Sequence, residues 1–389
     1  MHKHDMHTYK RLPLTFTRGQ GVWLWDQEDN KYLDALAGIA VCTLGHAHDA
    51  VTQAICEQAG LLLHTTNLFQ IEHQDRLADK LCALAQMDRA FFCNSGAEAN
   101  EAAIKLARLY ARQRQIQNPS IIVMEGAFHG RTLATLTASG SRKIQAGFEP
   151  LVQGFNRVPY NDIEAVRQVA ENNADVVAIM LEPIQGESGV VVPDDGYLKA
   201  LREICNEQGW LLILDEIQTG LCRTGQWFAW MHEAAQPDII TLAKSLGNGV
   251  PIGACLARGQ AAELFQPGSH GTTFGGNPLV CRVALVVLET LENNGLAQQA
   301  ANHGDYLKQQ LQQLLAGYDF VKEIRGKGLM VGIELDRPAP SLVQDALKLG
   351  VVLNVTAETV IRLLPPLIIS KSEIDQLCQA IQQLLKDFA

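Results

Sequence analysis

The sequence predicts an α/β protein with a mainly parallel central sheet and a second, smaller α/β domain. Two observations support this fold class. From about residue 70 onward, short β-rich runs alternate with helical patterns, and apolar runs separated by helices are typical of parallel strands buried on both faces. The chain also has 389 residues, and chains of this length usually divide into more than one domain, each with its own hydrophobic core.

The predicted elements follow in chain order. Apolar and polar residues alternate on both sides of the turn-forming DQEDN, which predicts a β-hairpin within residues 19–41. Helical periodicity covers residues 97–115, and a long helical stretch around and after residues 275–292 precedes a final amphipathic helix over residues 372–388. Strands are predicted at residues 120–125, 133–138, 175–183, 210–216, 237–243, 329–335, 351–355 and 360–369.

The two ends of the chain are expected to form the smaller domain together. The N-terminal hairpin and the late strands both lie outside the long alternating region. We therefore expect a large domain over residues 56–280 and a small domain built from residues 1–55 and 281–389.

The amino-acid composition of the chain argues against several classes of function. The formal net charge of −10 argues against nucleic acid as a partner, since phosphate binding requires a basic face. No apolar run is long enough to span a bilayer, and the first residues lack the apolar centre of a signal peptide. The nine cysteines are odd in number and form no CxxC pair, which predicts free thiols in a reducing, cytoplasmic compartment.

Three ionisable residues lie at the carboxyl ends of predicted strands. Asp215, Lys244 and Glu182 each come directly after an apolar run, and in open α/β sheets ligands bind at the carboxyl ends of the strands. Taken singly, Asp215 is equally well explained as a turn or capping residue, and Lys244 as a solvated surface lysine. Together they predict one shared site.

The start of a predicted helix adds a third feature to the lysine and the carboxylates. Ser95 and Glu98 form a capping-box pattern before an alanine-rich helix, and this pattern alone indicates only a well-capped helix. However, Ser95, Gly96 and Ala97 leave an uncrowded helix N-terminus, which suits a phosphate. A lysine, a carboxylate and a phosphate site are what pyridoxal 5'-phosphate requires, because the cofactor forms a Schiff base and its ring nitrogen pairs with an acid.

The motifs resemble those of a known family. The segments LILDEIQTGLCRTG and LAKSLGNGVPIGA, together with CNSGAEANEAAIKLAR, EGAFHGRTLATL, EPIQGESGV and HGTTFGGNPL, resemble class III pyridoxal-phosphate aminotransferases over nearly the whole chain. Within the class, the compact length and HTTNLF are most similar to the acetylornithine aminotransferases. The resemblance implies a fold-type I architecture, and it departs at Cys222, where glycine is commoner, and at Ser245, where glycine or alanine is usual.

The resemblance also implies roles around the cofactor. Lys244 is the expected Schiff-base lysine, Asp215 pairs with the pyridine nitrogen, and Gln218 contacts the phenolic oxygen. The residues expected to hold the phosphate are Ser95, Gly96 and Ala97.

The resemblance implies further contacts, with the face of the cofactor ring and with a second subunit. Phe128 is expected to stack on the ring, although core packing would explain this residue by itself. Thr273 is expected to reach the phosphate of a neighbouring subunit, and Thr272 to lie close to substrate. A homodimer with shared active sites follows from these roles.

Arginine forks bind carboxylates in two places. Arg131 is implied to bind the carboxylate of the amine donor and Arg362 the α-carboxylate of glutamate. We hypothesise that Glu182 pairs with Arg362 when the amine donor is bound and moves away for glutamate, and a static salt bridge is the alternative.

The activity that the resemblance implies is transfer of the terminal amino group of N2-acetyl-L-ornithine to 2-oxoglutarate. Succinylornithine, succinyl-diaminopimelate, ornithine and 4-aminobutyrate remain alternative donors, because pockets discriminate single methylene or acyl groups weakly. Two hypotheses belong to other functional classes: the protein is an isomerase of the aminomutase type, or it is a scaffold protein without catalytic activity. The histidines at positions 2, 4, 7, 46 and 48 are not expected to bind metal.

Overall fold

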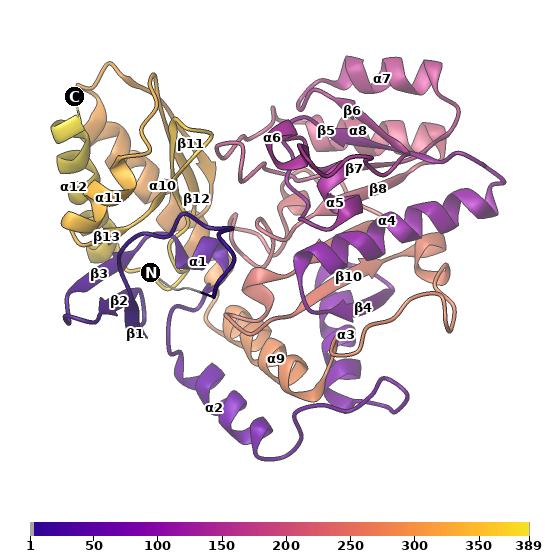
Figure 1. The fold of residues 1–389 in the computed structure, drawn as a ribbon, viewed down its shortest axis with the longest axis horizontal. Coiled ribbons are helices and arrows are strands. Elements are labelled where there is room, and N and C mark those ends of the chain that lie inside the picture. The colour runs from indigo at the N-terminus through magenta and orange to yellow at the C-terminus, as the bar shows by residue number, and fades with distance from the viewer. Residues whose placement is uncertain (1–3, 389) are drawn as a thin grey trace.

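The computed structural model describes residues 4–388 and divides them into a large and a small lobe (Figure 1). The strands are β1 (Phe16–Gln20), β2 (Trp23–Asp26), β3 (Lys31–Asp34), β4 (Arg89–Cys93), β5 (Ser120–Met124), β6 (Phe155–Val158), β7 (Val176–Leu181), β8 (Leu211–Asp215), β9 (Ile239–Leu242), β10 (Gly253–Ala257), β11 (Val321–Lys327), β12 (Met330–Leu335), β13 (Val351–Val352), β14 (Asn354–Thr356) and β15 (Val360–Leu363). The helices are α1 (Ala37–Ala40), α2 (Asp49–Ala59), α3 (Glu72–Ala85), α4 (Gly96–Gln113), α5 (Leu133–Ala138), α6 (Arg142–Gln145), α7 (Ile163–Asn172), α8 (Tyr197–Gln208), α9 (Pro278–Asn293), α10 (Leu296–Leu315), α11 (Leu342–Lys348) and α12 (Lys371–Phe388).

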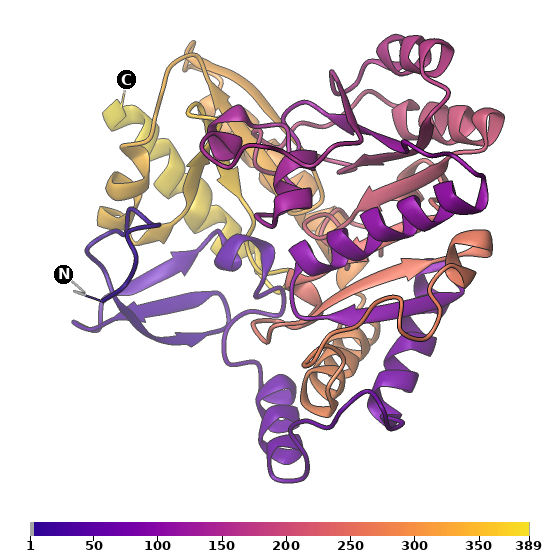
Figure 2. The same cartoon turned by 45° about the vertical axis from the view of Figure 1, so that its right-hand side comes forward.

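The large lobe is built on a seven-stranded sheet in the order β4-β10-β9-β8-β7-β5-β6. The pairs from β9 to β6 are parallel, and β10 alone in this sheet runs against its neighbours. Strands β5, β7, β8 and β9 are buried at every position, as expected for strands covered on both faces. Figure 2 shows α4 lying across one face of this sheet. The predicted mainly parallel sheet is confirmed.

The small lobe combines the two ends of the chain. Strands β1, β2 and β3 form an antiparallel meander, and β13 from the C-terminal part adds to β3 in parallel. A second sheet has the order β11-β12-β15-β14 and is antiparallel. The hairpin expected around DQEDN is confirmed by the pairing of Trp25 with Lys31. The exact domain boundaries stay a prediction.

One expected strand is a helix. Residues 133–138 form α5, whereas the run LATLTA predicts a strand from its β-branched content. The helix starts here because the Thr132 N–H donates to Thr135 Oγ1 at 3.1 Å. This backbone N–H at the start of the helix therefore has a partner without pairing to a neighbouring strand. Leu133 is 62% exposed, so the alternation in this run does not mark one buried face. Local capping therefore outweighs strand propensity here.

Two C-terminal strands are shorter than expected. The prediction for residues 351–355 divides into β13 and β14, which belong to different sheets. The strand expected over residues 360–369 ends with β15 at Leu363, because Pro365 and Pro366 come after Leu364 and cannot donate to a ladder.

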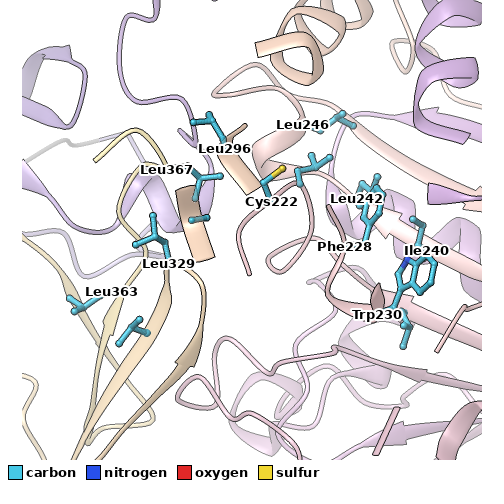
Figure 3. Close-up of a cluster of buried hydrophobic side chains, with 14 of the residues drawn as sticks. Cys222, Phe228, Trp230, Ile240, Leu242, Leu246, Leu296, Leu329, Leu363 and Leu367 are labelled. Carbon is cyan, nitrogen blue, oxygen red and sulfur yellow. The ribbon is translucent and has the colours of Figure 1, made fainter. Parts of the chain in front are cut away.

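The two lobes share one hydrophobic core. Cys222 lies between Leu329 and Leu367 of the small lobe and Leu246 of the large lobe (Figure 3). The fully buried Arg223 beside it donates through Nη1 to the carbonyl oxygens of Leu329 at 3.0 Å and Pro365 at 2.6 Å. These contacts hold the lobes together at the base of the cleft.

Two kinds of feature are absent from residues 4–388. No helix there has the length and apolar content to cross a membrane. No three His, Cys, Asp or Glu side chains in that part of the chain are grouped as a metal site. His2 lies outside the described residues.

Candidate active site

A cavity of about 410 Å³ opens at the carboxyl ends of β8 and β9. It collects predicted residues that are far apart in the sequence. The predicted site residues that line it are Ser95, Gly96, Ala97, Phe128, Arg131, Glu182, Asp215, Gln218 and Lys244. Arg362 is adjacent, because its Nη1 donates to Gln218 Oε1 at 3.3 Å. The structure thus brings ten of the twelve predicted residues together.

Lys244 follows β9 after Ala243 and lines this cavity. Burial lowers the pKa of its amine to about 8, even though the nearby Glu187 carboxylate favours the charged form. The backbone of Lys244 is left-handed, with φ of 43°, a conformation that costs energy for a residue with a side chain. Such strain is found at positions where function constrains the backbone.

Asp215 is held by three donors at the end of β8. Its Oδ2 accepts from Asn100 Nδ2 and His129 Nδ1, both at 2.8 Å, and its Oδ1 accepts from the Ile217 N–H at 3.1 Å. Asp215 is 3% exposed, so these bonds compensate the burial of its charge. Thr241 fixes the amide of Asn100 by donating to its Oδ1 at 2.7 Å.

Sequence reasoning missed Asn100 and His129. Asn100 lies on the buried face of α4, and His129 directly follows Phe128 in the FHGR motif. The signal for His129 was its position beside two predicted site residues. Asn100 gave a weaker signal, which was a polar residue at a core position of an amphipathic helix.

The predicted phosphate site is a well-formed helix N-terminus. Ser95 Oγ accepts from the Glu98 N–H at 3.3 Å, so the expected N-cap is confirmed. The Glu98 carboxylate accepts at 2.9 Å from the N–H of Asn94 rather than from that of Ser95, so the reciprocal bond of a capping box is replaced by one to the preceding residue. Gly96 and Ala97 begin α4, where backbone N–H groups have no partner within the helix. A Cβ on Gly96 would lie 2.6 Å from Ile217 Cδ1. This position therefore accepts only glycine without rearrangement.

The carboxylate that pairs with Arg362 is Glu187 rather than Glu182. Arg362 is fully buried, and its Nη1 lies 2.6 Å from Glu187 Oε1. Glu182 instead accepts from the Phe128 N–H at 2.9 Å and the Gly186 N–H at 3.3 Å. In this structure backbone donors therefore hold Glu182 away from Arg362, and a Glu182–Arg362 pair in the donor-bound enzyme stays a hypothesis.

The surroundings shift the pKa values of these two carboxylates in opposite directions. It raises the pKa of Glu182 to about 7, so this group takes up a proton near neutral pH. The pKa of Glu187 is lowered, since the charge of Arg362 outweighs the effect of burial. Glu187 lies five positions after Glu182 in EPIQGE, and that second glutamate was the signal that sequence reasoning missed.

Arg131 and the two threonines complete the predicted set. The Arg131 guanidinium lies 5.7 Å from the centre of the Phe128 ring at the exposed side of the cavity. Thr272 Oγ1 accepts from Asn94 Nδ2 at 3.1 Å. Because Asn94 directly precedes Ser95, Thr272 lies next to the predicted phosphate site. Thr273 is exposed and does not line the cavity of its own chain.

These groups fit a phosphorylated aldehyde cofactor. An amine with a lowered pKa can attack a carbonyl near neutral pH. A fixed carboxylate can pair with a ring nitrogen, and a glycine-opened helix start can bind a phosphate. The His129 Nε2 atom is buried and has no hydrogen-bond partner among the described residues. An adjoining ligand or water would satisfy this nitrogen.

Comparisons with known proteins agree with this geometry. The aminotransferase class-III family model matches residues 5–385. An acetylornithine aminotransferase from Nitrosomonas europaea is 57% identical over 385 residues, which are 99% of this chain and 98% of that protein.

Solved structures give the same result. Ornithine aminotransferase from Toxoplasma gondii ME49 matches with a TM-score of 0.96 at 35% identity, covering 99% of this chain and 93% of that one. Acetylornithine aminotransferase from Elizabethkingia anophelis matches with a TM-score of 0.89 at 36% identity, covering 99% and 97%. Since sequence and fold agree over almost the full length, this chain belongs to the class-III aminotransferase family.

Proposed function

We propose that this chain is a pyridoxal 5'-phosphate-dependent acetylornithine aminotransferase of arginine biosynthesis. It transfers the terminal amino group of N2-acetyl-L-ornithine to 2-oxoglutarate, giving N-acetyl-L-glutamate 5-semialdehyde and L-glutamate. The observation that carries the reaction type is the half-buried Lys244 facing the same cavity as the fixed Asp215. The full-length identity of 57% to an acetylornithine aminotransferase favours the donor.

The cavity residues would hold the cofactor. Lys244 would bind its aldehyde carbon, and Asp215 its ring nitrogen. The phosphate would be held by Ser95, Gly96 and Ala97, with Thr273 contributed by a second subunit. Phe128 would cover one ring face, and Gln218 would reach the phenolic oxygen. When bound, pyridoxal 5'-phosphate supplies a carbonyl that accepts an amino group and a ring that accepts electrons.

Lys244 would also move the proton. Transamination requires a base that removes a proton from the substrate carbon and returns it to the cofactor side. An amine with a pKa of about 8 is close to the optimum for such transfer near neutral pH. Asn100 and His129 fix Asp215 Oδ2, so Asp215 would present a carboxylate in a constant position to the ring nitrogen.

Two substrates of different charge must use one pocket. Arg131 would bind the carboxylate of acetylornithine, while Arg362 stays paired with Glu187. Glutamate brings a second carboxylate, and we propose that it replaces Glu187 on Arg362. Glu187 is 38% exposed through its side chain, so it has room to move toward solvent. The switch that the sequence suggested for Glu182 is therefore assigned to Glu187.

We also propose a cytoplasmic homodimer with shared active sites. Apolar side chains are exposed on two adjacent segments, with Leu68 at 87%, Phe69 at 67% and Phe274 at 61%. Asn67 Nδ2 joins the segments by donating to the Gly275 carbonyl at 3.2 Å. Exposed apolar patches of this kind are typical of subunit interfaces, and Thr273 lies within the patch. The nine free thiols are consistent with a reducing compartment.

Steady-state kinetics across amine donors tests the proposal. We expect kcat/KM with 2-oxoglutarate to be at least about tenfold higher for N2-acetyl-L-ornithine than for L-ornithine, 4-aminobutyrate or succinyl-diaminopimelate. Ornithine is the second candidate, because the TM-score of 0.96 is to an ornithine aminotransferase. A preference for ornithine would replace the proposed donor, and turnover without 2-oxoglutarate would indicate an isomerase.

Half-reaction kinetics of Glu187→Gln test the carboxylate switch. Without a competing carboxylate on Arg362, we expect the KM for L-glutamate to fall several-fold, while the half-reaction with acetylornithine slows. Glu182→Gln is the matched control, since Glu182 does not contact Arg362. Equal effects of Glu187→Gln on both half-reactions would leave a static salt bridge as the explanation.

A further inference from the structure

A short loop between β7 and α8 carries Glu187, the carboxylate that pairs with Arg362. This Glu187 loop consists of residues 186–191, which lie outside every helix and strand. Val190 within it is fully buried and has a left-handed φ of 53°. A β-branched residue rarely adopts that conformation. The surroundings of the loop must therefore hold it in shape.

Arg325 of the small lobe holds the backbone of the Glu187 loop. Its Nε donates to the carbonyl oxygens of Gly189 at 3.2 Å and Val190 at 3.0 Å, and its Nη2 donates to the Gly189 carbonyl at 2.6 Å. Its Nη1 pairs with Glu323 at 2.7 Å and also with Glu334. The side chain is only 13% exposed. Two carboxylates thus fix the planar guanidinium, and its other N–H groups bind the loop.

Arg325 and Arg362 lie in one row across the small-lobe sheet. Arg325 on β11 is opposite Gly332 on β12, and Gly332 is opposite Arg362 on β15. Residues directly opposite one another in a sheet project to the same face. Both arginines therefore lie on the face that the Glu187 loop covers. One arginine binds the backbone of the loop, and the other binds its carboxylate.

Gly332 between the two arginines allows the loop to approach the sheet closely. A Cβ at this position would lie 3.1 Å from Val190 Cβ and 3.3 Å from the Gly189 carbonyl oxygen. Val190 also belongs to a buried cluster with Met330 and Leu364 of the small lobe. The small lobe therefore places the backbone of the Glu187 loop by packing as well as by hydrogen bonds.

The position of this backbone decides where the Glu187 carboxylate lies. Glu187 Oε1 is 2.6 Å from Arg362 Nη1. Arg362 has other partners, because its Nε donates to Asn354 Oδ1 at 3.2 Å and its Nη1 to Gln218 Oε1 at 3.3 Å. The guanidinium of Arg362 thus stays in place when Glu187 leaves. A shift of the loop would weaken the pair by moving Glu187 rather than Arg362.

We propose that Arg325 is a positioning residue for the carboxylate exchange at Arg362. By binding two backbone carbonyls it fixes the Glu187 loop, so that the carboxylate returns to Arg362 whenever no substrate carboxylate is there. Only the Glu187 side chain then moves when L-glutamate binds, and the backbone of the loop stays. The inference rests on the proposed function, because the exchange that it serves is part of that function.

Hydrogen exchange tests the clamp without any assay of activity. Arg325→Lys keeps a positive charge for the two glutamates, but an ammonium cannot reproduce the fork that binds the loop. We expect the amides of residues 186–191 in this variant to exchange at least about tenfold faster, measured by mass spectrometry of the holoenzyme. Lys327→Ala is the matched control and should exchange normally, since Lys327 on the same strand pairs with Asp195, outside the loop, at 3.8 Å. Unchanged exchange in Arg325→Lys would refute the clamp.

Half-reaction kinetics test whether the clamp serves Arg362. The readout is the ratio of kcat/KM for L-glutamate to kcat/KM for N2-acetyl-L-ornithine. We expect Arg325→Lys to raise this ratio at least about threefold, because a loosely placed Glu187 competes less well with the substrate carboxylate. The same substitution in a Glu187→Gln background should leave the ratio unchanged, since no carboxylate is left to position. A purely structural role would give the same effect in both backgrounds.

Gly332→Ala displaces the same loop while Arg325 stays in place. Its added Cβ crowds Val190 and should raise the ratio in the same direction, so this variant decides if Arg325→Lys does not fold. Faster exchange with an unchanged ratio would refute the link to Arg362. An unaltered protein that does not convert L-glutamate would refute the proposed function and the positioning role with it, whereas the exchange experiment would still judge the clamp.

Discussion

At the scale of single residues, the site depends on groups whose environment changes their usual chemistry. Lys244 has a pKa lowered to about 8 mainly by burial, and the Glu187 carboxylate works against that shift. An amine must be uncharged to react with an aldehyde. The availability of the uncharged Lys244 amine is therefore set by the balance between burial and the neighbouring charges, of which Glu187 has the largest effect.

Cofactor binding to the apoprotein should follow the titration of Lys244. We expect the rate of reconstitution with pyridoxal 5'-phosphate, followed by visible absorbance, to rise about tenfold per pH unit and to level off above pH 8. Glu187→Gln should shift the midpoint to lower pH, because it removes a charge that stabilises the ammonium. Lys244→Ala should give no reconstituted band. A midpoint near 10 would contradict the prediction.

Cys222 offers a test of backbone strain. Its φ is 72°, a left-handed value that favours glycine. Its side chain also packs between the lobes, so any smaller residue loses contacts. Cys222→Gly and Cys222→Ala both remove the thiol, but we expect the glycine variant to be more stable by about 1 kcal/mol. Urea unfolding of the two variants measures the difference, and a more stable alanine variant would refute the argument.

At the scale of elements, α4 combines a structural and a binding role at its first turn. Ser95→Ala removes the cap and should cost about 1 kcal/mol of unfolding free energy. It should also weaken cofactor binding, measured by dissociation on dilution. The control is Asp162→Ala at the start of α7, where Asp162 Oδ1 accepts from the Ala165 N–H at 2.9 Å. That variant should lose similar stability without any change in cofactor affinity.

The strand ends were readable from the sequence because buried parallel strands are continuous apolar runs. The residues after the two runs, Asp215 and Lys244, could thus be placed at one edge of the sheet, and the structure adds that β8 and β9 are neighbours there. The helix at 133–138 could not be foreseen, since it depends on one threonine cap. The Glu187–Arg362 pair could not be predicted from the sequence either, because it joins residues of two lobes whose relative position follows from tertiary packing.

At the scale of the whole molecule, the exposed apolar segments around Phe69 and Phe274 predict that assembly and activity are coupled. Phe69→Glu places a charge in the proposed interface. We expect monomers in analytical ultracentrifugation and a loss of turnover of at least about tenfold, even though Phe69 does not line the cavity. Leu349→Glu, on the small lobe, should leave both unchanged. A dimeric or fully active Phe69→Glu protein would argue against shared sites.

The pairing of β3 with β13 has a consequence for how the protein is made. One partner is synthesised near the beginning of the chain and the other near its end. A ribosome adds about 5–20 residues per second, so the first hairpin waits for some tens of seconds before its neighbouring strand exists. During translation the hairpin edge stays unpaired, and release of the finished chain is the moment at which this lobe can close.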